Sequence, residues 1–179
     1  MRDRKLLNIE LGRVSAEEYK ALPPSGICVV LDNIRSAHNV GSVLRTADAF
    51  KADKVLLCGI TPLHPSPEIH KSALGAEDSV EWKHYDHTLT AVEELRAGGW
   101  TPVSVEQTVG SVSLETFVPE EGKKYALIFG SEVGGVAQDV VDASDFALEI
   151  PQFGTKHSLN ISVSAGVILW HFTLNRIQP

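Results

Sequence analysis

The sequence has few cysteines and no long apolar run, and these absences exclude several classes of protein. Its 179 residues include two cysteines, Cys28 and Cys58, both in apolar segments. A secreted chain of this size would usually have a richer cysteine framework, so we expect two buried free thiols and a cytoplasmic location. No apolar run is long enough to cross a bilayer, and no charged-then-apolar leader opens the chain, so we expect no membrane association.

Signatures for metals and common nucleotide cofactors are also missing. The seven histidines have no zinc-like spacing and no cysteine pair accompanies them, so we expect no metal site. The chain has no Walker A motif and no G-x-G-x-x-G spacing. The net charge of −7 argues against a protein that coats nucleic acid non-specifically, because phosphate contacts need lysine and arginine.

The acidic net charge does not exclude a local basic patch at the start of the chain. The first twenty residues contain five basic side chains, namely Arg2, Arg4, Lys5, Arg13 and Lys20. One interpretation is an RNA contact, and the other is a solvated, partly frayed terminus. We therefore treat residues 1–25 as a basic extension with a short helix and residues 26–179 as the main domain. In that helix, Ser15 and Glu18 predict a capping box.

Strand-like and helical segments alternate through the rest of the chain. Hydrophobic residues make up 43% and charged residues 22%, which suits one globular domain. Strands are expected at 27–33, 53–59, 79–85, 101–107, 124–130 and 146–151. Helices are expected at about 39–50, 88–99, 136–143 and 158–176. Because several strands are apolar throughout, the pattern predicts an α/β fold with a mostly parallel sheet and helices on both faces.

The last predicted helix has almost no polar face. A helix that is apolar nearly all round is buried on most sides. In a chain of this length, a second subunit would supply the missing cover. We therefore expect a homodimer that forms through residues 158–176.

The stretch "NVGSVLRTADAF" combines polar residues with a glycine at a helix start. We expect Asn39 to cap the helix and Gly41 to leave a hollow. Arg45, one turn later, could reach across that hollow toward an anionic group at the positive end of the helix. The alternative is that Arg45 only pairs with Asp48 on a solvated face.

Two further stretches follow the ends of predicted strands, where parallel sheets bind ligands. "LIFGSEVGGV" places Glu132 among Gly130, Gly134 and Gly135, and backbone of this kind can approach a ligand closely. The alternative is a tight turn with an exposed acid. "IPQFGTKHSLNISVSAG" begins the last helix with Ser158 and Asn160. These two could serve only as helix-start residues.

Together and in this order, the three stretches resemble the motifs of the SPOUT methyltransferases. The likeness is to the TrmH (SpoU) branch of RNA 2′-O-ribose methyltransferases, and it covers roughly residues 27–172. "KSALGAED" and "SVEQT" also look like family segments. The resemblance implies a deep C-terminal trefoil knot whose walls bind S-adenosylmethionine. It also implies dimerisation through the last helix, in agreement with the argument above.

The resemblance further assigns roles by motif match. Arg45 would be the catalytic residue, positioned with the help of Asn39, Glu132, Ser158 and Asn160. Cofactor-binding residues would be Gly130, Ile150, Leu159, Ser158 and Asn160, with Glu106 near the adenine or methionine pocket. RNA-binding residues would be Arg2, Arg4, Lys5 and Arg45. A guanidinium stays protonated, so we expect Arg45 to bind phosphate and to stabilise the developing alkoxide rather than act as a base.

The predicted function is therefore methyl transfer from S-adenosylmethionine to a ribose 2′-hydroxyl of tRNA or rRNA. The short segment before the domain favours tRNA. Two other classes remain as alternatives. One is a catalytically silent RNA-binding or assembly module of the same fold. The other is a nucleotide-dependent oxidoreductase on an unknotted sheet, which the missing G-x-G-x-x-G disfavours.

Overall fold

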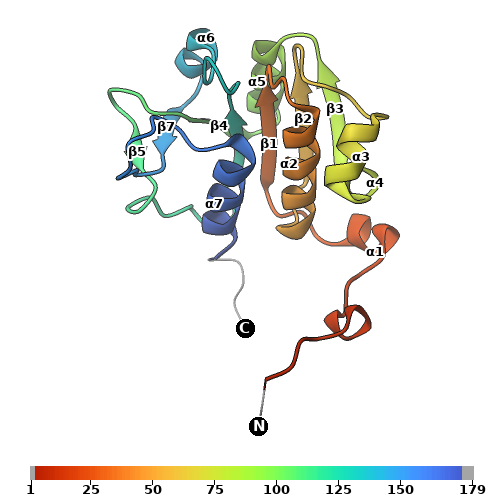
Figure 1. Cartoon of the computed structure of the whole chain (residues 1–179). Coiled ribbons are helices and arrows are strands. Elements are labelled where there is room, and N and C mark those ends of the chain that lie inside the picture. Colours follow the sequence, from red (N-terminus) through yellow and green to blue (C-terminus); the bar gives the residue numbers. More distant parts are fainter. Residues whose placement is uncertain (1–2, 175–179) are drawn as a thin grey trace.

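The protein is a three-layer α/β structure, and the computed structural model describes residues 3–174 (Figure 1). The strands are β1 (Ile27–Asp32), β2 (Lys54–Cys58), β3 (Glu81–Tyr85), β4 (Trp100–Val105), β5 (Val112–Ser113), β6 (Lys124–Phe129) and β7 (Phe146–Glu149). The helices are η1 (Asn8–Leu11), α1 (Ala16–Ala21), α2 (Ala37–Ala49), α3 (Pro67–Ala73), α4 (Ala76–Ser79), α5 (Thr88–Ala97), α6 (Gln138–Asp142) and α7 (Ile161–Leu174).

All seven strands form one parallel sheet in the order β3-β2-β1-β6-β4-β7-β5. This confirms the predicted sheet and most predicted elements. The short strand β5 and the 3-10 turn η1 were not expected. Their sequences are too short to show a hydrophobic period, so no residue pattern predicted them. The trefoil knot stays a prediction.

Helices cover both faces of the sheet, as the apolar strands require. Side chains alternate along each strand, so β1 sends Val29 and Leu31 to one face and Cys28 and Val30 to the other. The first set packs with residues of α2, α3 and α7 in the larger core. The second set packs with residues of α5 and α6.

A switch in the face of the sheet on which the connecting helices lie positions the site. Strands β1 and β6 are neighbours, but α2 follows β1 on one face and α6 follows β6 on the other. Such a switch point leaves a crevice beyond the carboxyl ends of the strands. The three sequence stretches with unusual polar residues all reach this end of the sheet.

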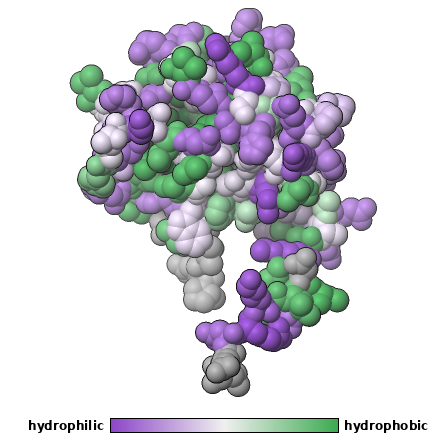
Figure 2. All heavy atoms as spheres, viewed as in Figure 1, coloured by the Kyte–Doolittle hydropathy of each residue, from purple (hydrophilic) through white to green (hydrophobic). Residues whose placement is uncertain are grey.

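The N-terminal segment projects away from the domain (Figures 1 and 2). The expected capping box of α1 is present, because Ser15 Oγ accepts from Glu18 N at 3.2 Å and Glu18 Oε2 accepts from Ser15 N at 2.7 Å. The segment also exposes apolar side chains, and Ile9 is 89% exposed. In Figure 2 the projecting segment shows hydrophobic surface.

Candidate active site

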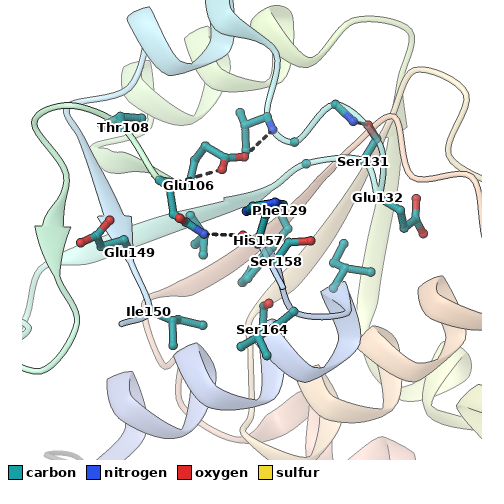
Figure 3. A pocket seen from close by; sticks show the side chains of 18 of the residues that line it. Glu106, Thr108, Phe129, Ser131, Glu132, Glu149, Ile150, His157, Ser158 and Ser164 are labelled. Carbon is teal, nitrogen blue, oxygen red and sulfur yellow. Dashed lines mark hydrogen bonds between the residues drawn. The ribbon is translucent and has the colours of Figure 1, made fainter. Parts of the chain in front are cut away.

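A cleft of about 680 Å³ lies at the carboxyl ends of β4, β6 and β7. A volume of this order suits a ligand of cofactor size. The cleft is lined by the loop after β4, the glycine loop after β6, the segment after β7 and the start of α7 (Figure 3). The lining includes the following residues predicted for the site: Glu106, Gly130, Glu132, Ile150, Ser158, Leu159 and Asn160.

The glycine loop is a tight turn that also forms a wall of the cleft. Ser131 N donates to Gly135 O at 3.0 Å, and Gly135 N donates to Ser131 O at 2.9 Å. Gly135 has φ +66°, which favours glycine. A Cβ on Gly130 would collide with the backbone of Gly135 and Val136. The loop's own backbone therefore requires Gly130, as the tight-turn alternative implied, in addition to any space that a ligand needs.

A chain of hydrogen bonds joins the three sequence motifs beside the cleft. Asn39 Nδ2 donates to Glu132 Oε1 at 2.8 Å, and Asn160 Nδ2 donates to Asn39 Oδ1 at 3.3 Å. Asn160 Oδ1 in turn accepts from Ser162 N at 2.9 Å. The structure thus brings Asn39, Glu132 and Asn160 together from α2, the glycine loop and the start of α7.

Glu132 is held as a carboxylate. Desolvation raises its pKa, but hydrogen bonds from Asn39 and from backbone N–H groups, including that of Arg35, outweigh this effect and lower the pKa. The carboxylate is therefore ionised at neutral pH. It can fix the Asn39 amide in one orientation, with the amide oxygen toward Asn160.

Neither of the two candidate helix caps, Asn39 and Ser158, takes that place in the structure. Ser36, not Asn39, caps α2, because Ser36 Oγ accepts from Asn39 N at 3.2 Å. The helix begins earlier than the apolar period indicated, which frees the Asn39 side chain for Glu132. Likewise α7 begins at Ile161, and Asn160 rather than Ser158 accepts from the first turn. Ser158 lies exposed on the cleft wall.

The hollow expected at Gly41 does not exist. Gly41 is buried against α3, and a Cβ there would collide with Ser72 Oγ and the carbonyl oxygen of Ile69. Glycine at this position allows two helices to approach closely. The sequence could not distinguish a helix contact from a ligand contact, because both need a missing side chain.

Arg45 is exposed and does not belong to the cleft lining. It follows Asn39 by six residues, which places it about 120° away around the helix axis. Among the described residues it forms no ion pair with Asp48, so that alternative is not seen either. The structure therefore leaves the guanidinium on the open face of α2.

The basic N-terminal residues are only partly available. Arg4 donates to Glu10 with both terminal nitrogens, at 2.9 and 2.6 Å. The hydrogen bond from Arg4 lowers the pKa of Glu10 to about 2, so the pair is charged at neutral pH. Lys5 is exposed, and Arg2 lies outside the described residues.

Two polar residues at or beside the cleft were not predicted from the sequence. Gln107 Nε2 donates to the carbonyl oxygen of His157 at 2.8 Å and joins two loops of the cleft (Figure 3). Asp32 ends β1 and is only 1% exposed. Its charge directly after an apolar run was the one available signal.

Two features that the sequence does not predict, a metal site and a membrane-spanning helix, can be sought among the described residues. Within residues 3–174, no group of three or more histidine, cysteine or acidic side chains is arranged to hold a metal ion. No helix in the same range has the length and hydropathy needed to span a bilayer.

Comparisons with known proteins agree with this geometry. The model of the SpoU rRNA Methylase family matches residues 26–170. The 23S rRNA (guanosine-2′-O-)-methyltransferase RlmB of Nitrosomonas europaea is 32% identical over 155 residues, which cover 84% of this chain and 57% of that protein. The chain therefore spans little more than half the length of that relative.

Solved structures show the same fold. The AdoMet-bound rRNA methyltransferase from Sinorhizobium meliloti superposes with a TM-score of 0.79 at 25% identity, over 90% of this chain and 61% of that one. A structure described as giving insights into 2-OH methylation of C/U34 on tRNA has a TM-score of 0.73 at 25% identity. That match covers 85% of this chain and 97% of the other.

A parallel sheet with a cleft at its switch point and three converging polar motifs defines a protein of the SPOUT methyltransferase class. Since the family model covers most of the sequence, the chain belongs to the SpoU rRNA methylase family.

Proposed function

We propose that this protein is an S-adenosylmethionine-dependent RNA methyltransferase that modifies a ribose 2′-hydroxyl. The observation that carries this proposal is the hydrogen-bond chain Glu132–Asn39–Asn160 along a cleft of cofactor size. This chain joins the three family motifs at one place. Family membership supports the reaction class.

The cleft fits S-adenosylmethionine in size and in the groups that line it. It offers backbone from Gly130, Ile150 and Leu159 for the polar parts of the cofactor, together with the side chains of Ser158 and Asn160. When bound, the cofactor supplies a methyl group on a positively charged sulfur. Transfer would break the C–S bond and form a C–O bond, with S-adenosylhomocysteine as the leaving group and the hydroxyl proton passing to solvent.

The main contribution of the protein to such a transfer is alignment. Fixing the sugar oxygen and the methyl group in line can supply about 7–11 kcal/mol in favourable cases. The glycine loop and the Asn39–Glu132 contact would hold the cofactor side rigid. Arg45, which is exposed on α2, would bind an RNA phosphate and stabilise negative charge on the sugar oxygen.

For the substrate we favour tRNA over rRNA. The protein described for C/U34 of tRNA is matched over almost its whole length, so this chain contains a counterpart of nearly all of it. The relative from Nitrosomonas europaea acts on 23S rRNA by its name, which makes rRNA the alternative outcome. Lys5 and Arg45 would contact the RNA backbone, and release of Arg4 from Glu10 would add a third cation.

The proposed enzyme is a cytoplasmic homodimer. Helix α7 buries one side against the core but exposes four large apolar side chains along the other, namely Val163, Val167, Trp170 and Leu174. These positions repeat every three or four residues, so they form one stripe. A second copy of the helix would cover it. The predicted interface residues 175–176 lie outside the described chain.

The reaction is tested by incubating the purified protein and labelled S-adenosylmethionine with tRNA and rRNA from a strain that lacks the gene. Nucleoside mass spectrometry should show one new 2′-O-methylated nucleoside in tRNA. The Arg45→Ala variant should bind the cofactor and lose methylation. Cofactor binding without methylation of either RNA by the wild-type protein would favour the silent RNA-binding module instead.

A further inference from the structure

The glycine loop is held from both sides by carboxylates of neighbouring strands. Strand β6 lies between β1 and β4 in the sheet. Asp32, at the end of β1, accepts from Ala137 N at 3.0 Å through Oδ2. Glu106, directly after β4, accepts from Val136 N at 3.0 Å through Oε2. Two consecutive backbone N–H groups are thus bound by two acids that approach from opposite flanks.

Asp32 is an unusual residue for this position, because it is only 1% exposed. In the described part of the chain it forms no ion pair, and its charge is met by hydrogen-bond donors alone. Oδ1 accepts from Thr88 Oγ1 at 2.5 Å and from Asn33 Nδ2 at 2.9 Å. Burying a carboxylate is costly unless it is fully hydrogen-bonded. A buried acid with its second oxygen on the loop backbone therefore fixes that loop tightly.

Glu106 completes the arrangement on the other side. Its second oxygen, Oε1, accepts from Gln107 N at 2.9 Å, so both oxygens are occupied by backbone donors. A Cβ on Gly135 would collide with the Glu106 carboxylate. In Figure 3 the Glu106 side chain points toward the glycine loop, and a dashed line marks the bond. The carboxylate is thus occupied by the loop and not free for a ligand.

We infer that Asp32 and Glu106 are positioning residues, which hold the glycine loop in its cofactor-binding shape through the N–H groups of Val136 and Ala137. For Glu106 this replaces the expected direct contribution to the cofactor pocket. The inference rests on the proposed function. A loop already fixed before binding loses less conformational freedom when the cofactor arrives, and the affinity rises accordingly.

The test compares Asp32→Ala with Thr88→Val. The first variant removes the acceptor of Ala137 N, and the second removes only the hydroxyl partner on the opposite oxygen of Asp32. Calorimetry with S-adenosylmethionine should show a Kd raised at least tenfold for Asp32→Ala and changed less than threefold for Thr88→Val. Asp32→Asn should restore only part of the affinity, because its amide oxygen can still accept from Ala137 N while its amide nitrogen faces Asn33 Nδ2, a second donor.

A second measurement uses the protein without cofactor. Hydrogen exchange of the Ala137 amide should speed up at least tenfold in Asp32→Ala, and that of the Val136 amide likewise in Glu106→Ala. If both variants keep exchange rates and affinity within twofold of wild type, the inference is wrong. It is equally wrong if Thr88→Val weakens binding as much as Asp32→Ala, since the effect would then be one of stability alone.

The two proposals can fail separately. If the wild-type protein does not bind S-adenosylmethionine, the proposed function fails, while the exchange measurement still tests whether the two acids hold the loop. If Asp32→Ala does not fold, Glu106→Ala carries the test by the same criteria. Glu106 is partly exposed, so its removal leaves no buried cavity.

Discussion

The side-chain amide of Asn39 donates a 2.8 Å hydrogen bond to Glu132 across 93 residues of sequence. This contact joins α2 to the glycine loop, and Asn160 extends it to α7. It explains why an asparagine lies inside the first turns of a helix, where a good helix former would otherwise be favoured. Both the nitrogen and the oxygen of the Asn39 amide are thus hydrogen-bonded to neighbouring elements.

The first prediction concerns this contact. Asn39→Asp keeps the oxygen that faces Asn160 but places a second oxygen against Glu132. We expect the free energy of unfolding to fall by about 1–3 kcal/mol, because the donor is lost and two acidic groups face each other. Urea unfolding followed by circular dichroism measures the change. Ser42→Ala, on the solvent side of α2, should change stability by less than about 0.5 kcal/mol. Equal effects of the two variants would contradict the assignment.

The second prediction is the pH dependence of the same contact. The pKa of Glu132 is lower in the folded protein than its ordinary value. Its stabilising contribution is therefore complete above the unfolded pKa of about 4.3 and is lost as the pH falls through the lower folded value. Wild type should be more stable than Glu132→Gln by a constant amount from pH 5 upward, and this difference should shrink in acid. Urea titrations at several pH values check it, and a difference that grows in acid would refute it.

The third prediction tests the helix contact at Gly41. Gly41→Ala should destabilise the protein by about 1–3 kcal/mol, despite the better helix propensity of alanine, because α2 and α3 must separate. The double variant with Ser72→Ala should recover only part of the loss, since the carbonyl oxygen of Ile69 still blocks the new methyl group. Thermal unfolding measures both. A stabilised Gly41→Ala protein would show that the helices are not in close contact.

The fourth prediction concerns the exposed stripe of α7. Val167→Glu should raise the dimer dissociation constant at least tenfold, because it places a charge in the proposed apolar interface. Ile60→Glu serves as the control, since Ile60 is 63% exposed and lies outside α7. Sedimentation velocity over a range of concentrations separates monomer from dimer. An unchanged dimer in Val167→Glu would place the interface elsewhere.

The fifth prediction concerns the two thiols. Burial raises the pKa of Cys58 to about 12 and also raises that of Cys28. A thiol is reactive only as thiolate. Both cysteines should resist iodoacetamide at pH 8 in the native protein and react fully in urea, as mass spectrometry can show. Rapid labelling of the folded protein would mean that the sheet opens locally.

The sequence predicted the strands well because their apolar runs reflect burial on both faces. The resemblance to the SPOUT motifs also located seven of the residues that line the cleft. Prediction failed where one pattern serves two purposes. Gly41 looked like space for a ligand, but it is space for α3. Asn39 looked like a cap, and only the position of Glu132 in three dimensions shows its role.

The position of Arg45 shows the limit of helical spacing as a guide. Its four-residue distance from Gly41 correctly puts both on adjoining turns. It does not show that Gly41 faces α3 while Arg45 faces solvent. The contacts of Asp32 and Glu106 with the glycine loop were equally hidden, because their partners are backbone N–H groups, which every sequence contains.

The hydrogen bond between Asn39 and Asn160 spans 121 residues and has a consequence for biosynthesis. The chain leaves the ribosome from its N-terminus, so β1 and α2 emerge long before the segment that completes the cleft. Contacts between such distant positions form slowly. A nascent chain halted before residue 150 would lack this partner of Asn39 and the wall from Ile150 to Asn160. Binding capacity is therefore acquired only after the segment from Ile150 to Asn160 has emerged.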